Sequence, residues 1–542
     1  MYRTHIHDLD DDSLLQIVGY YRLKHEENWN LRLLWRNLAQ VCRRWRYFIF
    51  DFSSHLDICL SLTNYSPPMD MLGHLPPIPL VINYSDRTRT MTSTDEDNIR
   101  LGLERHDRVR QVNLQAPSPN FHSWFSQMNQ HFPRLEDLSL LSTTTETEET
   151  GLMLPETLQA PNLRHLSLHG VSLPTGLSSL SSTIALSTLS LTHIRPSCYF
   201  PPRHLVTRLK DLPHLEELSI GFVALPNSKL SKGELSPAPI SPVALPALRR
   251  LTFRGVDAYL DNLAAQINAP LLERLTLTLH FDITFTLAKL AEFINRTKGL
   301  RFLVARVIFN RDGVSTDASY NEQQGGGKSN LHVNVKCEPV DWQIDSATQV
   351  CSALGKVLST VQELTLDVRD FGMPSDWEST LEDVPWQELL LPFIGVKKLH
   401  IGSSLMLELS QALNSGTGGL VVPELQELEV SLKIDEVTNA LTAFIETRES
   451  LGRHIDLLVP PEDKEENMRI QATLAGRRSQ RQELENYWER KLEDAVKEAV
   501  EAERKELEYH WQRKVEAERK EKEIWKARTL ALEEKLKGLD VS

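Results

Sequence analysis

The sequence predicts an α/β solenoid, a stack of repeats in which parallel strands line a concave face and helices lie on the convex side. The first observation is a phrase, Pro-x-Leu-x-x-Leu-x-Leu, that recurs along most of the 542 residues. Many copies are about 23 to 35 residues apart, a period typical of stacked repeats. The second observation is that amphipathic helical patterns alternate with these copies. Close copies begin at Pro133, Pro161, Pro213, Pro246, Pro270 and Pro423, and looser copies at Val109, Leu186, Leu300, Val361 and Val396.

A repeat of this size cannot bury its own apolar edge, so neighbouring repeats must stack into one continuous core. Such a stack exposes a long surface and offers no enclosed reaction pocket. We therefore expect a binding protein and not an enzyme. The histidines are dispersed, no Ser/His/Asp arrangement can be assembled from local motifs, and we expect no metal ion and no cofactor. The run Gly325–Ser329 resembles a phosphate loop, but Glu322 occupies the position where that loop needs its first glycine.

Composition narrows the function classes further. The net charge of −14 argues against a general nucleic-acid binder and against binding to anionic membranes, because both need a cationic surface. The five cysteines are scattered without metal-ligand spacing, so we expect reduced thiols in an intracellular protein, cytoplasmic or nuclear. We expect neither a signal peptide nor a membrane span, because no sufficiently long apolar run occurs.

Residues 1–55 are predicted to form a small helical domain. Asp12 or Ser13 can cap a first helix, and a polar loop leads to a second helix that ends near Val41. A unit of about 40 residues buries too little surface to be stable alone. Its large apolar side chains therefore need a partner, which is either another protein or the open end of the repeat stack.

Leu9 is followed by acidic residues and then by the run Leu14-Leu15-x-Ile17. The segment ends in Val41-Cys42-Arg43-Arg44-Trp45. Together these features resemble an F-box. Further along, Asp97-Asn98-Ile99 and Glu338-Pro339-x-Asp341-Trp342 are similar to fungal F-box-like proteins with divergent leucine-rich repeats. The resemblance covers about residues 6–460 and implies binding to the Skp-type adaptor of a cullin complex. It also implies the residues at or beneath that adaptor interface, which are Leu9, Leu14, Leu15, Leu34, Leu38, Val41, Cys42 and Trp45.

Residues 56–105 are expected to form a linker or cap between the helical domain and the repeats. The repeats are expected to occupy residues 106–460. Within each repeat the leucines point into the core and the intervening residues point outward with a period of two. The position between the last two leucines carries a small hydroxyl, which suits an evenly polar face. This column holds Ser139, Ser167, Ser190, Ser219, Thr252, Thr276 and Thr365.

Charge on the outward positions is uneven. The middle repeats present Arg250, Arg254, Arg274 and Arg306, and later repeats present acidic residues such as Glu363 and Glu427. Because adjacent strands are about 4.8 Å apart, a row of arginines on successive strands could bind an acidic or phosphorylated segment of a target. The alternative is that these arginines are ordinary solvent-exposed residues and bind no target.

The last predicted segment, residues 461–542, is rich in Glu, Lys, Arg and Ala. Pairs such as Glu493 and Lys497 place an acid four residues before a base, which favours a helix. A continuous helix over this segment would be about 110 Å long. A seam that includes Leu484 and Trp488 favours self-association as a coiled coil, and the charges favour an isolated helix.

These expectations combine into one leading hypothesis, a substrate-recognition subunit of an SCF-type ubiquitin ligase. The N-terminal helices would bind the Skp adaptor, and the repeat surface would bind an unknown target protein. The alternative is an interaction scaffold with a vestigial F-box that assembles through the C-terminal helix.

Overall fold

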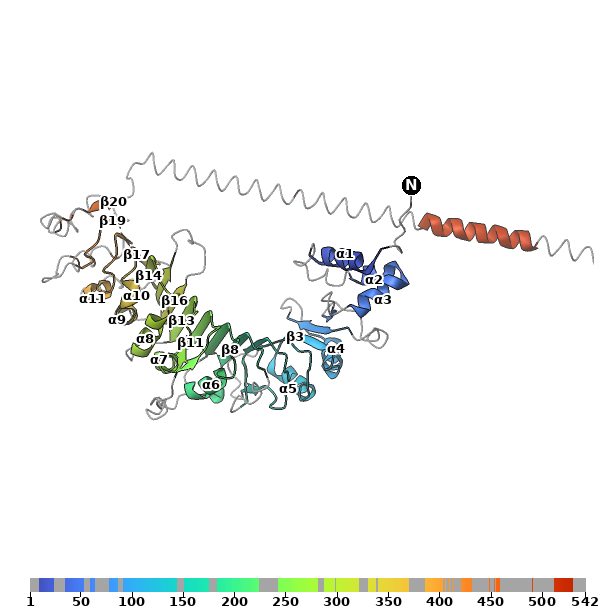
Figure 1. Cartoon of the computed structure of the whole chain (residues 1–542), viewed down its shortest axis with the longest axis horizontal. Coiled ribbons are helices and arrows are strands. Elements are labelled where there is room, and N and C mark those ends of the chain that lie inside the picture. The colour runs from blue at the N-terminus through green and yellow to red at the C-terminus, as the bar shows by residue number, and fades with distance from the viewer. Residues whose placement is uncertain are drawn as a thin grey trace, which may run out of the picture. The chain divides into compact units, whose positions relative to one another are not determined.

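The computed structural model (Figure 1) describes sixteen longer stretches and a few single positions of the chain. The predicted adaptor residue Leu34, the Gly325–Ser329 run and the seam around Leu484 and Trp488 lie outside the described residues. The described stretches are residues 9–23, 35–52, 59–63, 78–85, 91–143, 151–174, 183–223, 242–280, 287–297, 299–320, 330–337, 340–369, 386–402, 421–430, 455–458 and 511–529.

The chain divides into two compact units, Met1–Val459 and Pro460–Ser542. The first unit begins with three helices, α1 (Asp11–Leu23), α2 (Trp35–Val41) and α3 (Arg43–Asp51). The Asp10 carboxylate accepts a hydrogen bond of 2.7 Å from the Ser13 amide at the start of α1, and Cys42 is the N-cap residue of α3. Each side chain thus satisfies one backbone amide at a helix start.

A large, mostly parallel sheet of 16 strands follows, so the first unit is a mixed α/β structure, as the sequence predicts. Its strands, in spatial order, are β1 (Leu60–Leu62), β2 (Leu80–Tyr84), β3 (Val109–Ala116), β4 (Asp137–Ser142), β6 (His165–His169), β8 (Thr188–Ile194), β9 (Glu217–Phe222), β11 (Arg250–Gly255), β13 (Arg274–His280), β16 (Leu331–Lys336), β15 (Gly313–Ser319), β14 (Val304–Asn310), β17 (Glu363–Val368), β18 (Lys398–Ile401), β19 (Glu427–Val430) and β20 (Asp456–Leu458). Residues 56–105, expected to link or cap, contribute β1 and β2 to this sheet. Two small sheets pair β5 (Leu152–Met153) with β7 (Val171–Ser172) and β10 (Val243–Ala244) with β12 (Ile267–Asn268).

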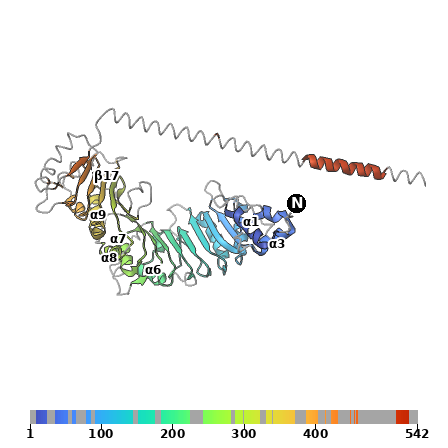
Figure 2. The same ribbon diagram turned by 45° about the horizontal axis from the view of Figure 1, so that its top comes forward.

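Helices cover one face of the sheet (Figures 1 and 2). Apolar side chains alternate along the strands, and the buried ones face these helices, as α8 illustrates with its buried Leu290, Phe293 and Ile294. We call the opposite side, formed by the alternate strand residues that are half-buried or exposed, the open face. The helices are α4 (Ser93–Glu104), α5 (Ser118–Gln127), α6 (Pro202–Leu209), α7 (Asp257–Gln266), α8 (Ala288–Arg296), α9 (Val340–Ala353), α10 (Gly355–Leu358) and α11 (Trp386–Leu390), with a short 3₁₀ turn, η4 (Pro196–Cys198).

The recurring phrase forms the same turn in successive copies. The amide of its first leucine donates to the carbonyl of the residue before the proline, as Leu135 does to Phe132 at 3.3 Å and Leu163 does to Ala160 at 3.1 Å. Proline suits this turn because it has a fixed φ and no amide to satisfy. The turn therefore satisfies its backbone groups locally, and the following leucines enter the sheet with one register.

The copy that begins at Leu300 departs from the order expected of simple stacking. Strand β14 does not lie beside β13; instead β14, β15 and β16 form an antiparallel meander, in which β16 pairs with β13 and β14 pairs with β17. The reversal uses a tight turn between Asn310 and Gly313, and Gly313 has a positive φ of 145°, which only glycine adopts readily. This long-range pairing overrides the sequential order of the repeats.

One apolar core runs through the first unit. Leu14, Trp45 and Ile49 of the helical domain belong to the same buried cluster as Leu60 and Leu62 of the first strand. The N-terminal helices therefore pack on the end of the sheet.

The described part of the second unit is Arg490 and a helix over residues 511–529, and the side chains of all these residues are exposed. Trp511 and Trp525 are among the exposed large apolar residues of this helix. No helix among the described residues combines the length and apolarity that a membrane crossing requires.

Candidate protein-interaction surfaces

The residues predicted for the adaptor interface divide by burial. Leu14 and Trp45 are buried in the core, so they stabilise the helical domain from within. Leu9, Leu15, Leu38 and Cys42 are partly buried against that core.

Val41 differs from the rest of this set, because 46% of it is exposed at the end of α2. Two other apolar residues of these helices are also exposed, Ile17 of α1 at 37% and Tyr47 of α3 at 62%. Ile17 belongs to the Leu-Leu-x-Ile run and could have been included from the sequence, whereas nothing in the sequence marked Tyr47. Exposed apolar residues on three helices are suited to contact another protein.

Contacts between polar groups also join the three helices. The Arg44 guanidinium contacts the Asp11 carboxylate at 2.9 Å and so joins α3 to α1. The Arg46 Nε donates a hydrogen bond of 3.0 Å to the Ala39 carbonyl oxygen and joins α3 to α2.

On the open face, the predicted column of small hydroxyls is continuous over six strands and stops at β13. Beyond it, the same row runs through the meander as His332, Asp317 and Arg306 before it reaches Thr365. The hydroxyls in direct register are Ser139, Ser167, Ser190, Ser219, Thr252 and Thr276.

The predicted arginine row is only partly formed. Arg250 and Arg274 are register partners on β11 and β13, and Arg254 lies on the same face of β11. Arg306 is not their neighbour, because β16 and β15 lie between β13 and β14. The sequence-based expectation of a row that includes Arg306 is therefore wrong, and the meander is the reason.

The three neighbouring arginines differ in their contacts. Arg250 forms an ion pair with Glu217 on β9, and the Arg254 Nε donates a hydrogen bond of 3.4 Å to the His280 Nε2. Arg274 forms no ion pair within the described part of the chain. Burial, followed by the positive charge of Arg254, lowers the pKa of His280, so His280 is neutral at pH 7 and adds no positive charge.

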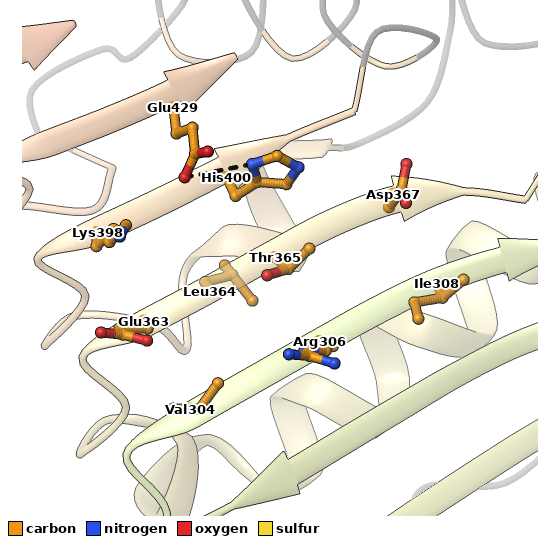
Figure 3. A pocket seen from close by; sticks show the side chains of 10 residues that line it. All are labelled: Val304, Arg306, Ile308, Glu363, Leu364, Thr365, Asp367, Lys398, His400 and Glu429. Carbon is orange, nitrogen blue, oxygen red and sulfur yellow. Dashed lines mark ion pairs between the residues drawn. The ribbon is translucent and has the colours of Figure 1, made fainter. Parts of the chain in front are cut away.

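Arg306 instead lines a groove of about 360 Å³ on strands β14, β17, β18 and β19 (Figure 3). Across these strands Arg306, Thr365, His400 and Glu429 are successive register partners. The His400 Nδ1 lies 3.6 Å from the Glu429 Oε2. The remaining lining residues are Val304, Ile308, Glu363, Leu364, Asp367 and Lys398.

Next to this groove, His332 of β16 and Asp317 of β15 form a short contact of 2.6 Å between the imidazole Nδ1 and the carboxylate. The hydrogen bond to Asp317 raises the pKa of His332, against the opposing effect of burial. This pair joins β16 to β15 within the meander.

Among the described residues, no group of three or more His, Cys, Asp and Glu side chains is placed to hold a metal ion. Burial raises the pKa of the Cys351 thiol to about 12, which keeps this thiol protonated and unreactive at neutral pH.

Comparison with protein-family models and with curated proteins finds no match for this chain.

Proposed function

We propose that this protein is a non-enzymatic substrate-recognition subunit of an SCF-type ubiquitin ligase. Helices α1–α3 act as an F-box-like domain that binds a Skp-type adaptor of the cullin complex. The strands and helices that follow act as a leucine-rich-repeat solenoid whose concave face, the open face, binds a target protein. The observation that carries the proposal is the exposure of Ile17, Val41 and Tyr47 on helices whose sequence resembles an F-box.

The shared core between the helical domain and the sheet supports this arrangement. Because Leu14 and Trp45 belong to the same cluster as Leu60, an adaptor bound to α1–α3 would hold the sheet at a defined position. A target on the open face would then be held near a ubiquitin-charged enzyme, at an effective concentration on the order of millimolar. Chemistry takes place on other subunits in this proposal, and the chain itself works inside the cell.

The test is co-purification of the adaptor with the full chain and with the double variant Ile17→Asp, Val41→Asp. We expect the variant to lose the adaptor while it keeps its thermal stability, because both side chains are already exposed. Ile184→Asp is the matched control, since Ile184 is an exposed isoleucine on a turn of the sheet; it should keep the adaptor. Absence of the adaptor from the wild-type sample would overturn the proposal.

The second candidate is a scaffold with a vestigial F-box that assembles through the C-terminal helix. It is favoured by the exposure of Trp511, Val515 and Trp525 on residues 511–529, which lie four and ten residues apart and share one side of a helix. If the scaffold proposal holds, light scattering of the full chain will give at least twice the monomer mass. The variant Trp511→Ala, Trp525→Ala will then give the monomer mass, and a monomeric wild-type chain would remove this candidate.

A further inference from the structure

Part of the open face is positively charged. On strands β11, β13 and β16 its charged residues are Arg250, Arg254, Arg274 and Lys336, and these strands present no carboxylate on this face. Glu217 on the adjacent strand β9 neutralises Arg250. Arg274 and Lys336 form no ion pair within the described residues. We call β11, β13 and β16 the basic segment.

A region of opposite charge lies farther along the same face. Strands β17 to β20 present Glu363, Asp367, Glu427, Glu429 and Asp456, against the single cation Lys398. We call these four strands the acidic segment. Five carboxylates and one ammonium leave it with a net charge of −4, with histidine neutral.

The two segments are separated by β15 and β14, whose charged residues on this face, Asp317 and Arg306, cancel. From Arg274 on β13 to Glu363 on β17 there are four strand steps, which correspond to about 19 Å. The Debye length at physiological ionic strength is about 8 Å. Each segment therefore attracts its own part of a partner and is little affected by the other.

The groove beside Arg306 adds shape to the acidic segment. Its volume of about 360 Å³ has room for a long side chain, and three of its lining residues are carboxylates, namely Glu363, Asp367 and Glu429. Arg306 and Lys398 oppose them, so the lining retains an excess of one negative charge.

We propose that the open face binds an extended partner segment at two points, with acidic or phosphorylated residues on the basic segment and basic residues on the acidic segment. At about 3.3 Å per extended residue, the 19 Å between the segments sets a spacing of about six residues between the two charged clusters of the partner. This proposal rests on the proposed function, because it specifies the class of target segment that the repeat surface would recognise.

The probe is a fluorescein-labelled peptide with four glutamates, a six-residue Gly/Ser spacer and three arginines, and binding to the full chain is measured by fluorescence anisotropy. A peptide of the same composition with its charges evenly interspersed is the control. We expect the clustered peptide to bind about tenfold more tightly than the interspersed one, because only the clustered charges match both segments. Equal affinities would overturn the proposal.

Charge-reversal variants test the two points separately. Arg254→Glu with Arg274→Glu brings the four charges of the basic segment to a net charge of zero, and Asp367→Lys with Glu427→Lys brings the acidic segment from −4 to zero. Each pair should weaken binding of the clustered peptide about tenfold. All four changes together leave neither segment with a net charge, so we expect the quadruple variant to bind the clustered and interspersed peptides equally. A quadruple variant that still binds the clustered peptide about tenfold more tightly than the interspersed one would overturn two-point recognition.

Adaptor co-purification and thermal unfolding of each variant separate this proposal from the proposed function. Variants that keep the adaptor and the wild-type melting temperature but bind the clustered peptide as tightly as the wild-type chain does would contradict the two-point proposal alone. Replacing the glutamates of the peptide by phosphoserines distinguishes the acidic source. Tighter binding of the phosphoserine peptide assigns a phosphorylated target, and equal binding assigns a carboxylate one.

Discussion

Several charged side chains on the sheet pair with partners one strand away. Arg110 contacts Glu136 at 3.0 Å, and Arg249 forms an ion pair with Glu273 on the next repeat. Glu136, Arg249 and Glu273 each directly precede a strand, and Arg110 is the second residue of β3, so each pair joins two copies of the repeating phrase. Exposed pairs of this kind contribute up to about 1 kcal/mol each, which makes them more useful for fixing the register of the strands than for overall stability.

His332 gives the clearest prediction for a single residue. Because Asp317 raises the pKa of His332 in the folded protein above its unfolded value, its contribution to stability is complete below that unfolded value, about 6.5. The contribution is lost as the pH rises through the folded pKa. We therefore expect His332→Gln to lower the free energy of unfolding more at pH 5.5 than at pH 8.5, to be checked by urea denaturation.

His280→Gln is the matched control, because burial lowers the pKa of His280. The folded state disfavours protonated His280, so removing this imidazole should relatively stabilise the protein as the pH falls below about 6.5. The same pH trend for both variants would contradict the assigned contacts.

At the scale of elements, the sequence predicted the strands well because their pattern is local. Phrases such as Pro213–Ile220 and Pro246–Phe253 carry both the turn and the alternation of apolar residues. The helical patterns at Tyr259–Ile267 and Leu287–Ile294 correspond to α7 and α8. The order of β13, β16, β15 and β14 was missed, since it depends on pairing between strands that the local pattern does not distinguish.

The meander depends on Gly313, and this gives a prediction at the element scale. A Cβ added at Gly313 would lie 2.0 Å from the carbonyl oxygen of Val335, and the positive φ there is unfavourable for any other residue. We expect Gly313→Ala to lower the free energy of unfolding by at least about 2 kcal/mol, measured by chemical denaturation.

Gly355→Ala is the control for this prediction. Its added Cβ would meet only Pro392, at 3.8 Å, and Gly355 lies in α10, where alanine is the better helix former by up to about 1 kcal/mol. Equal effects of the two substitutions would show that the Gly313 turn does not constrain the meander.

At the scale of the whole molecule, the sheet is long and has two ends that are protected differently. The end at β1 packs under the N-terminal helices through the shared core of Trp45, Ile49 and Leu60. At the other end, β20 pairs only with β19 among the described strands. A strand with one neighbour loses its hydrogen bonds more readily than one held on both sides.

Hydrogen exchange checks this difference. We expect the amides of β19 and β20 to exchange fastest, those of β1 and β2 more slowly, and those of β11 and β13 slowest, because the central strands have neighbours on both sides. Mass spectrometry of peptides from the full chain would measure the order. Uniform protection along the sheet would mean that the first unit unfolds as a single cooperative block.

The sequence by itself determined the repeating turn, the alternation of buried and outward residues and the small-hydroxyl column, because each follows from chemistry within about eight residues of chain. It also gave the charges of the open face, but not their neighbours. Only the tertiary structure decided that Arg250 is neutralised by Glu217, that Arg306 belongs with Thr365 and His400, and that Val41 is exposed where Leu14 is buried. These facts depend on which strands and helices meet across long separations in sequence, and that is set by packing of the whole core.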